Sequence, residues 1–590
     1  MLLVQLSFGA SEAVPDAGSR PRPGPNLVRR IRRSSIRSVT PIITASTPQS
    51  GHSGLSPSST QSMTSIASYT CRQWKQPHHI VLPSRGFGYT GHPGAAERRT
   101  VPRKRVRVRR PLLLLILLTT AGRLAFGWAI GLGVDESYMV SAGRVLSLGY
   151  FDHPPAAWWL SWASTHLFGS EAPVVARLPF ILLFALTTWM MARIGEILAG
   201  PSAGFWAAAT LNLSPVFGIT GGGWVLPDGP LDCALTGAAL CLIRALPARG
   251  LSAAGWWSGA GICAGLATFS KYSAVLTIAG AFLFLLLDPM HRRWLRRWEP
   301  YLAVVLALLV FSPVIVWNAS HEWASFAFQG TRAGGLRFRP WLTLTTLGGE
   351  ALFVLPWFWV PMMVLGVKAF QEGWREKLLA CLAAPPIIGF ALIAAWSSQR
   401  VMYHWASPGY LMLFPLLGRF VAEAWDLRVV RTVIAATAAV WVVSMATVGT
   451  HIRIDWLHTI MPAKDPTAEG LDWISLRDDL TARGLLAGGT IVGVPNWRDA
   501  GKIAHALGPD VTVICLNADS RQFGFASPAR RWDGSDVLVL VADRADTVIP
   551  ALGGKFDRLE PLPPSNVTLR GRTLKVVTVA RGTGFRPGGL

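Results

Sequence analysis

Charged side chains are scarce in this sequence. Asp, Glu, Lys and Arg make up 15% of its 590 residues, whereas 51% are hydrophobic, and soluble domains carry roughly a quarter charged residues. A single soluble core also stops growing near ~250–300 residues. The composition therefore excludes a soluble enzyme, a coiled coil and a disordered scaffold for most of the chain. It predicts a polytopic membrane protein with soluble ends.

Cysteine is also rare. The six cysteines are too few and too scattered for a disulfide framework. Four of them, Cys233, Cys241, Cys263 and Cys381, lie in apolar segments, where cysteine acts as a small hydrophobe. The sequence has no CxxC and no zinc-ligand spacing, and no GxGxxG or P-loop marks its last 120 residues as a nucleotide binder.

The net charge of +23 gathers at the N-terminal end. Residues 1–110 contain 18 Lys and Arg against 3 Asp and Glu, and six basic residues stand between 103 and 110, directly before PLLLLILLTT. A basic run beside a membrane helix fixes its orientation and attracts anionic lipid, and no recognition motif accompanies it, so we expect no nucleic-acid partner. Residues 1–100 are rich in Ser, Pro, Gly and Arg, which predicts a disordered segment. An upstream start-site artefact, with the protein beginning near residue 101, is the alternative.

Apolar segments recur between residues 111 and 449, and several reach the roughly 17–25 residues needed to cross a bilayer. We expect about eleven transmembrane helices, at 111–130, 174–198, 202–220, 230–247, 254–269, 273–288, 300–317, 348–367, 378–396, 405–421 and 432–449. With residue 110 in the cytoplasm, nineteen Lys and Arg residues fall at the cytoplasmic ends and seven at the opposite ends. That bias follows the positive-inside rule. It predicts a transmembrane domain at 101–450 with its N-terminus in the cytoplasm.

The character of the sequence changes after the last apolar segment. Short β-branched runs, TIVGV, VTVIC, DVLVLVA and LKVVTVA, alternate with helix-like stretches such as DAGKIAHAL, which is typical of an α/β fold. An odd number of spans puts this segment on the side opposite to the N-terminus. We therefore expect a small soluble α/β domain at 451–590, outside the cytoplasm.

Ionisable residues gather in the connections that this topology puts on the outer side. They are Asp135 and Glu136 at the start of the first outer loop (131–173), Asp152 and His153 in YFDHPP, Asp228 in LPDGP, Lys271 in FSKYS, His321 and Glu322 in WNASHEW, and Arg400 and His404. Ionisable side chains at membrane depth are costly and indicate function. The tryptophans Trp158, Trp159 and Trp162 suit the headgroup level. We expect the acids of the first loop just above the bilayer, where a lipid phosphate would lie.

Several motifs stand in a fixed order along the chain. They are Asp135-Glu136, GYFDHPP at 149–155, RLP at 177–179, PDGPL at 227–231, GLATFSKYSAVL at 265–276 and WNASHEWASFAFQ at 317–329. Taken together they resemble the polyprenyl-phosphate-dependent glycosyltransferases of the GT-C superfamily. The similar branch holds the protein O-mannosyltransferases, the lipid A aminoarabinose transferases and the lipopolysaccharide-core galacturonosyltransferases. The resemblance covers roughly 125–420, and more weakly WRDA (497–500) and DSRQFG (519–524).

The resemblance implies a glycosyltransferase of a bacterial inner membrane. It would move a sugar from a polyprenyl phosphate to lipid A, an oligosaccharide, a glycolipid or a protein of the envelope, with inversion at the anomeric carbon. Such a transfer needs a base for the acceptor hydroxyl and cations for the phosphate. The resemblance implies Asp135 as the base, with Glu136 orienting Asp135 or the acceptor. Lys271 would neutralise the leaving phosphate as a point charge, with His153 and Arg177 as further donor-phosphate contacts.

The other residues have less specific implied roles. Asp152 stands where relatives have Glu, and would bind the acceptor or a divalent cation; Asp228 and His404 would contact sugar or phosphate. His321 would be a second ligand if a metal binds at Asp152, although no ligand spacing supports this, and no cofactor is otherwise implied. Structural alternatives stay open. In these alternatives PDGP is only a turn motif, and Lys271 only extends its side chain to the membrane interface. Arg177 would pair with an acid or anchor the interface.

Two other functional classes stay open. A polyprenyl-lipid or sugar transporter would explain the spans, although transporters often contain internal repeats and none is visible here. A non-catalytic membrane scaffold with a C-terminal sensing domain would leave the clustering of acids and cations unexplained. An enzyme, unlike a transporter, turns over a lipid-linked sugar without a sealed vesicle.

Overall fold

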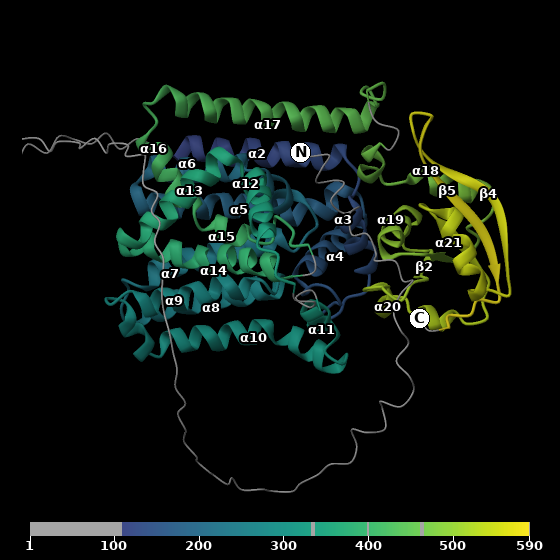
Figure 1. Cartoon of the computed structure of the whole chain (residues 1–590), viewed down its shortest axis with the longest axis horizontal. Helices are drawn as coiled ribbons and strands as arrows, with labels where there is room; N and C mark the ends of the chain where they lie inside the picture. The colour runs from purple at the N-terminus through teal and green to yellow at the C-terminus, as the bar shows by residue number, and fades with distance from the viewer. Residues whose placement is uncertain (1–108, 332–336, 398–399, 461–464, 589–590) are drawn as a thin grey trace, which may run out of the picture. The chain divides into compact units, whose positions relative to one another are not determined.

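Residues 109–331, 337–397, 400–460 and 465–588 are described by a computed structural model of the chain. The segment 1–100, predicted to be disordered, lies outside these residues. The described part contains a bundle of apolar helices, a group of short helices at one end of the bundle, and a mixed β-sheet beyond them (Figure 1).

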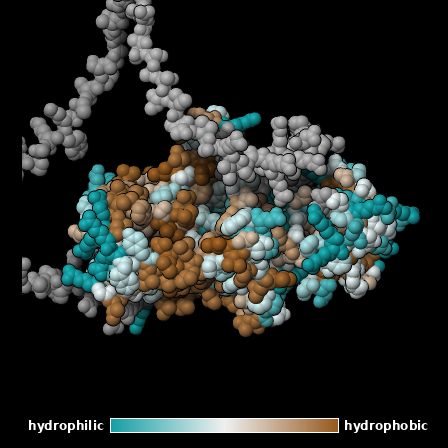
Figure 2. Space-filling model, turned by 90° about the horizontal axis from the view of Figure 1, so that it is seen from below, coloured by the Kyte–Doolittle hydropathy of each residue, from teal (hydrophilic) through white to brown (hydrophobic). Residues whose placement is uncertain are grey.

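The helices of the bundle follow the predicted apolar segments. In chain order they are α2 (Arg109–Ala129), α5 (Pro173–Ala199), α6 (Pro201–Leu213), α7 (Asp228–Ala245), α8 (Gly250–Ser270), α9 (Ala274–Leu287), α10 (Glu299–Ser320), α12 (Trp341–Val354), α13 (Pro356–Lys368), α14 (Trp374–Trp396), α15 (Ser407–Leu411), α16 (Phe414–Glu423) and α17 (Arg428–Ile454). A helix satisfies its own backbone hydrogen bonds, as a segment in lipid must. Leu118, Leu309 and Val440 point outward from α2, α10 and α17. Figure 2 shows a broad apolar band across the bundle, with hydrophilic residues at its left edge and over the C-terminal sheet at the right.

Five helices of the described residues are long and apolar enough to cross a membrane: α2, α5, α10, α14 and α17. Helices α12 and α13 meet the same criterion only as a pair, because a bend of 112° separates them. The apolar segment predicted as a span at 348–367 is therefore bent and is not one straight helix. Leu355 at the bend has a φ of 91°, and Pro356, which starts α13, has no N–H with which to continue α12.

The short helices at the end of the bundle form the first loop and one later connection. They are α3 (Val134–Ala142), α4 (Ala156–Phe168) and α11 (Ala324–Thr331). Tyr150 stacks on Trp158 at 4.4 Å between ring centroids, and both side chains are fully buried. The ring of Trp158 therefore fills the core of the loop and does not contact lipid.

The C-terminal sheet has five strands in the order β2-β1-β3-β5-β4. β1 (Ile491–Val494) runs parallel to β2 (Thr512–Cys515) and β3 (Val537–Val541), whereas β5 (Arg572–Thr583) runs antiparallel to β3 and to β4 (Arg558–Leu569). Four strands coincide with the β-branched runs of the sequence. β4 does not, because Pro561, Pro563 and Pro564 interrupt its pattern. Proline is tolerated there since β4 is an edge strand.

The helices of this segment connect the sheet to the bundle. They are α18 (Ile474–Ala482), α19 (Trp497–Leu507), α20 (Phe523–Ala526) and α21 (Ala545–Leu552). Asn496 caps α19 by accepting hydrogen bonds from the backbone N–H groups of Arg498 and Asp499. The buried side of α19, including Ile503, shares one apolar core with Tyr138 of α3 and Val492 of β1. The first loop and the C-terminal segment therefore pack as one structure.

Candidate active site

One cavity of about 490 Å³ brings most of the predicted ionisable residues together. It lies where α3 and the starts of α7 and α9 meet the loop after α14 and the C-terminal domain. Its lining includes Asp135, Asp152, His153, Asp228, Lys271, Arg400 and His404. Glu136, Arg177 and His321 are not among the lining residues.

Asp135 and Glu136 are neighbours in the first turn of α3, but their surroundings differ. Successive residues of an α-helix point about 100° apart. Asp135 is exposed and lines the cavity, whereas Glu136 is only 2% exposed. The helix dipole favours carboxylates in a first turn. Helix α3 thus presents one carboxylate to a ligand and keeps the other inside the protein.

Glu136 forms a buried ion pair with Arg177. Arg177 Nε and Nη2 donate to the Glu136 carboxylate at 2.8 and 2.5 Å. Its other hydrogen bonds reach the carbonyls of Gly127, Ile130 and Gly131. Glu136 also accepts from the backbone N–H groups of Gly133 and Val225. This geometry favours the structural alternative for Arg177, a partner for an acid, over a contact with the donor phosphate.

Asp152 joins the first loop to the C-terminal domain. The Asp152 side chain accepts a hydrogen bond from Tyr138 Oη at 3.2 Å, and Arg521 Nη1 lies 3.6 Å from its other oxygen. Burial raises the pKa of Tyr138 well above its usual value, and the Asp152 charge adds to that shift. The phenol therefore stays a neutral donor to Asp152. Arg521 also lies over the Trp497 ring, 4.1 Å from its centroid.

Lys271 meets Asp228 in the wall of the cavity. Lys271 follows the last residue of α8, and Asp228 is the first residue of α7. Their Nζ and Oδ1 atoms are 3.0 Å apart, and 12% and 8% of the two side chains is exposed. The ammonium group has three donors, so the pair with Asp228 leaves donors for a ligand oxygen. The carboxylate fixes the direction in which Lys271 points.

The predicted metal site at Asp152 and His321 does not match a ligand cluster among the described residues. The only group there of three or more acidic, His or Cys side chains with ligand atoms within 4.8 Å is His451, Asp455 and Asp465. Arg572 bridges its two carboxylates at 2.6 and 2.7 Å, so a guanidinium neutralises that group. His321 Nδ1 lies 2.8 Å from the carbonyl of Trp317, and His321 does not line the cavity.

The C-terminal domain contributes cavity residues that were not predicted from the sequence. Trp497, Arg498 and Arg521 line the cavity, as do Tyr138 and Gln329 of the membrane part. Gln329 Nε2 donates to the carbonyl of Asp152 at 2.5 Å. The signal was present in the weaker motifs, because Trp497 and Arg498 begin WRDA and Arg521 stands in DSRQFG.

Known proteins resemble both the sequence and the fold. Residues 152–317 match the family model described as dolichyl-phosphate-mannose-protein mannosyltransferase. Lipid A galacturonosyltransferase RgtD from Rhizobium johnstonii is 26% identical over 290 residues, which are 47% of this chain and 58% of that protein. ArnT from Cupriavidus metallidurans, solved with undecaprenyl phosphate, is 15% identical, and the match covers 80% of this chain and 98% of ArnT with a TM-score of 0.55. These proteins are GT-C glycosyltransferases, and this chain is similar to them in sequence over part of its length and in fold.

The resemblance predicted from the motifs is confirmed at the level of the GT-C superfamily. The apo form of the same ArnT gives a TM-score of 0.52 at 13% identity over 80% of this chain and 98% of ArnT, so the helical membrane part has the GT-C fold. This chain spans a little over half the length of RgtD. The family match includes Asp152, His153, Asp228 and Lys271, and Asp135 precedes it by seventeen residues.

Proposed function

We propose that this chain is an integral membrane glycosyltransferase. It moves a sugar from a polyprenyl-phosphate donor to an acceptor of the cell envelope, with inversion at the anomeric carbon. The observation that carries the proposal is a single cavity lined by the exposed carboxylate of Asp135 and the ammonium of Lys271. Support also comes from the similarity to RgtD, a lipid A galacturonosyltransferase, and to ArnT, which was solved with undecaprenyl phosphate.

In this reaction Asp135 acts as the general base. It takes the proton of the acceptor hydroxyl while that oxygen attacks the anomeric carbon. The bond from the anomeric carbon to the phosphate oxygen breaks, and the polyprenyl phosphate leaves with the electron pair. A single displacement of this kind inverts the anomeric centre, and a positioned base contributes about 10²–10⁴ in rate.

The cations of the cavity stabilise the leaving phosphate. Lys271 donates to a phosphate oxygen while Asp228 holds its side chain in place, and a fixed cation of this kind needs no reorganisation during the reaction. His153 contacts the same phosphate, and His404 and Asp152 contact the sugar or the acceptor. Glu136 and Arg177 act through α3, since their ion pair anchors the helix that carries Asp135.

A divalent cation has no part in this scheme. Asp152 would be its natural ligand, but its carboxylate already faces the Tyr138 hydroxyl and the Arg521 guanidinium. The guanidinium beside the carboxylate already supplies the opposite charge that a metal ion would bring. The residues around Asp152 therefore do not fit a divalent cation, and no step is assigned to one.

The domain organisation follows from the same proposal. Residues 101–450 form the GT-C catalytic domain with about eleven spans and the first outer loop at 131–173, and residues 451–590 form a periplasmic α/β domain. The N-terminus lies in the cytoplasm of a bacterial cell, and the protein is in the inner membrane. A reporter fused after residue 590 is expected to signal from the periplasm; a cytoplasmic signal would mean that the number of spans is even.

Turnover in detergent tests the proposed reaction. The purified full chain, with a polyprenyl-phosphate sugar and an extract of envelope acceptors, is expected to release polyprenyl phosphate and form a glycosylated product. A transporter would need a sealed vesicle and would leave the donor intact. Mass spectrometry of envelope glycolipids and glycoproteins from a deletion strain identifies the acceptor, which loses one sugar in that strain.

A further inference from the structure

Helix α3, which carries Asp135, is held by the C-terminal domain as well as by the membrane part. Gly501 of α19 lies against Tyr138 of α3 so closely that a Cβ on Gly501 would be 2.7 Å from Tyr138 Cα. Arg144, just beyond α3, donates to the carbonyl of Ala504 at 3.0 Å. The two helices therefore pack backbone against backbone.

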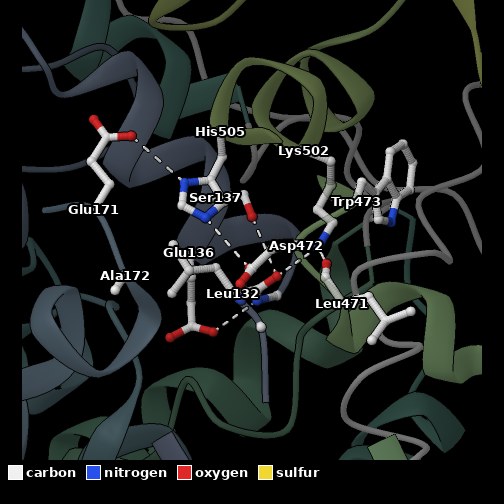
Figure 3. Close-up of polar contacts among 12 residues, drawn as sticks. Leu132, Glu136, Ser137, Glu171, Ala172, Leu471, Asp472, Trp473, Lys502 and His505 are labelled. Carbon is white, nitrogen blue, oxygen red and sulfur yellow. Dashed lines mark hydrogen bonds and ion pairs between the residues drawn. The ribbon is translucent and has the colours of Figure 1, made fainter. Parts of the chain in front are cut away.

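The segment just before α3 is bound by the same domain through its backbone. Gly131 N–H donates to the carbonyl of Gly470 at 2.8 Å. Leu132 N–H donates to Asp472 Oδ1 at 2.8 Å, and Lys502 Nζ donates to the Leu132 carbonyl at 2.7 Å (Figure 3). Both polar backbone groups of Leu132 thus end on the C-terminal domain, three residues before Asp135.

Lys502 is a buried cation with backbone partners. Lys502 is only 2% exposed. Besides the Leu132 carbonyl, its Nζ donates to the carbonyls of Glu469 and Leu471. Three carbonyls match the three donors of an ammonium group. Burying a charge is costly, and a methionine would fill similar space in an apolar core. The hydrogen bonds from Lys502 therefore indicate a requirement for fixed geometry at this point.

The contacts of Asp472 extend the same network into the first loop. His505 Nε2 lies 3.4 Å from Asp472 Oδ1, and His505 Nδ1 lies 3.7 Å from Glu171 Oε2 (Figure 3). Glu171 in turn accepts two hydrogen bonds from Arg144. One continuous set of polar contacts joins the C-terminal domain to both ends of the first loop.

We propose that Lys502 and Asp472 are positioning residues, which hold the first turn of α3, and with it the Asp135 carboxylate, through the backbone of Leu132. The proposal rests on the proposed function of Asp135 as the base. It assigns the C-terminal domain a part in the chemistry, since the direction of the base toward the acceptor hydroxyl depends on the docked domain. A displacement of about 1 Å at a reacting group costs about 100-fold in rate.

The ionisation of Lys502 gives the proposal a distinct signature. Burial lowers the pKa of Lys502 to about 8. The negative charges of Asp472, Glu469 and Glu136 oppose this shift, and the positive charge of Arg177 adds to it. His505 is a further basic residue of the network, and it contacts Asp472. Below this pH the ammonium has a donor for each of its three carbonyls. Above it the neutral amine has two donors, so one carbonyl loses its partner and α3 loosens.

The experiment compares Lys502→Met with Lys502→Arg in the purified full chain. Lys502→Met is expected to lower kcat about 100-fold, with the KM for the donor changed by less than about threefold. Lys502→Arg is expected to restore at least a tenth of the wild-type kcat and to remove the loss of activity just above pH 8, because a guanidinium holds its proton to higher pH than an ammonium group. Lys575→Met is the matched control, since Lys575 belongs to the same domain but pairs with Asp543 at 2.9 Å.

Three outcomes would overturn the positioning role. The first is a kcat for Lys502→Met within twofold of the wild type, and the second is a loss of kcat no larger than that of Lys575→Met. The third is an alkaline limb, meaning the fall of kcat above pH 8, that is the same in Lys502→Arg and the wild type. If Lys502→Met does not fold, Asp472→Asn replaces it. The amide oxygen of the substituted side chain would still accept from Leu132 N–H. Because the charge of Asp472 raises the pKa of Lys502, its loss is expected to move the alkaline limb of kcat to lower pH. An unmoved limb would contradict the proposal.

Hydrogen exchange separates this proposal from the proposed function. Amides of residues 132–138 are expected to exchange faster in Lys502→Met than in Lys575→Met, whether or not the protein turns over any donor. A wild-type protein without transferase activity would refute the proposed function and leave this readout intact. Equal exchange in the two variants would refute the positioning by Lys502 even in an active enzyme.

Discussion

The buried pair of Glu136 and Arg177 gives the sharpest test of how the site is built. Arg177 is 2% exposed and donates to both carboxylate oxygens of Glu136 and to three backbone carbonyls. Arg177→Met leaves Glu136 charged, buried and supported by backbone N–H groups alone. Removing one partner of a buried ion pair costs about 3–5 kcal/mol, and we expect a loss of about 3 kcal/mol in the free energy of unfolding.

The measurement is denaturant unfolding of the full chain in detergent, with donor binding followed in the same samples. Arg144→Met is the matched control, because Arg144 pairs with Glu171 in the same loop while 19% and 23% of the two side chains is exposed; its loss is expected near 1 kcal/mol. In a double-mutant cycle, Glu136→Gln with Arg177→Met is expected to show a coupling energy of about 2 kcal/mol.

One result would refute the structural role of Arg177. If Arg177→Met unfolds within about 0.5 kcal/mol of the wild type while its affinity for polyprenyl phosphate falls, Arg177 contacts the donor. The contact predicted from the RLP motif would then be right, and the structural role would be wrong.

Three further predictions concern the cavity and its support. Lys271→Met is expected to lower kcat for transfer about 100-fold, as for the loss of one donor to a developing oxyanion; steady-state kinetics within threefold of the wild type would contradict the phosphate contact. Arg521→Met is expected to lower kcat/KM about 10-fold through Asp152, as for a partly buried charge pair, and unchanged kinetics would make Arg521 a packing residue. His505→Gln tests a pH dependence of stability. Burial alone would lower the pKa of His505, but the adjacent carboxylates of Asp472 and Glu171 outweigh burial and raise it. The contribution of His505 to stability is therefore complete below about pH 6.5 and is lost as the pH rises through the folded-state pKa. The unfolding midpoint of His505→Gln is expected to fall further below that of the wild type at pH 6 than at pH 9, and equal differences at both values would contradict this.

Much of the membrane part follows from the sequence, because lipid imposes strong constraints. Apolar segments must form helices there, and the helices of the bundle overlap the predicted spans. The cost of ionisable residues at membrane depth made Asp135, Asp228 and Lys271 candidates for one site, and all three line the same cavity. The bend at Leu355 was not predicted, because the apolar pattern continues through it while the chain turns by 112°.

The roles of neighbouring polar residues were harder to predict. Asp135 and Glu136 have the same chemistry in sequence, and only the packing of α3 decides that one faces the cavity and the other faces Arg177. Arg521 depends on a contact with Asp152 across 369 positions of the chain. No local pattern encodes such a contact, so the motif DSRQFG indicated a resemblance without indicating a site.

In the proposed reaction, Asp135 removes the proton of the acceptor in the cavity that also holds the donor phosphate. The most direct measurement is single-turnover transfer by Asp135→Asn in detergent, with donor affinity measured in parallel and Asp510→Asn, an exposed carboxylate of the C-terminal domain, as the control. The rate of Asp135→Asn is expected to fall by about 10³ or more, within the range of a lost general base, while the donor Kd stays within about threefold. Transfer by Asp135→Asn at the rate of the wild type would contradict the role of Asp135 as the general base.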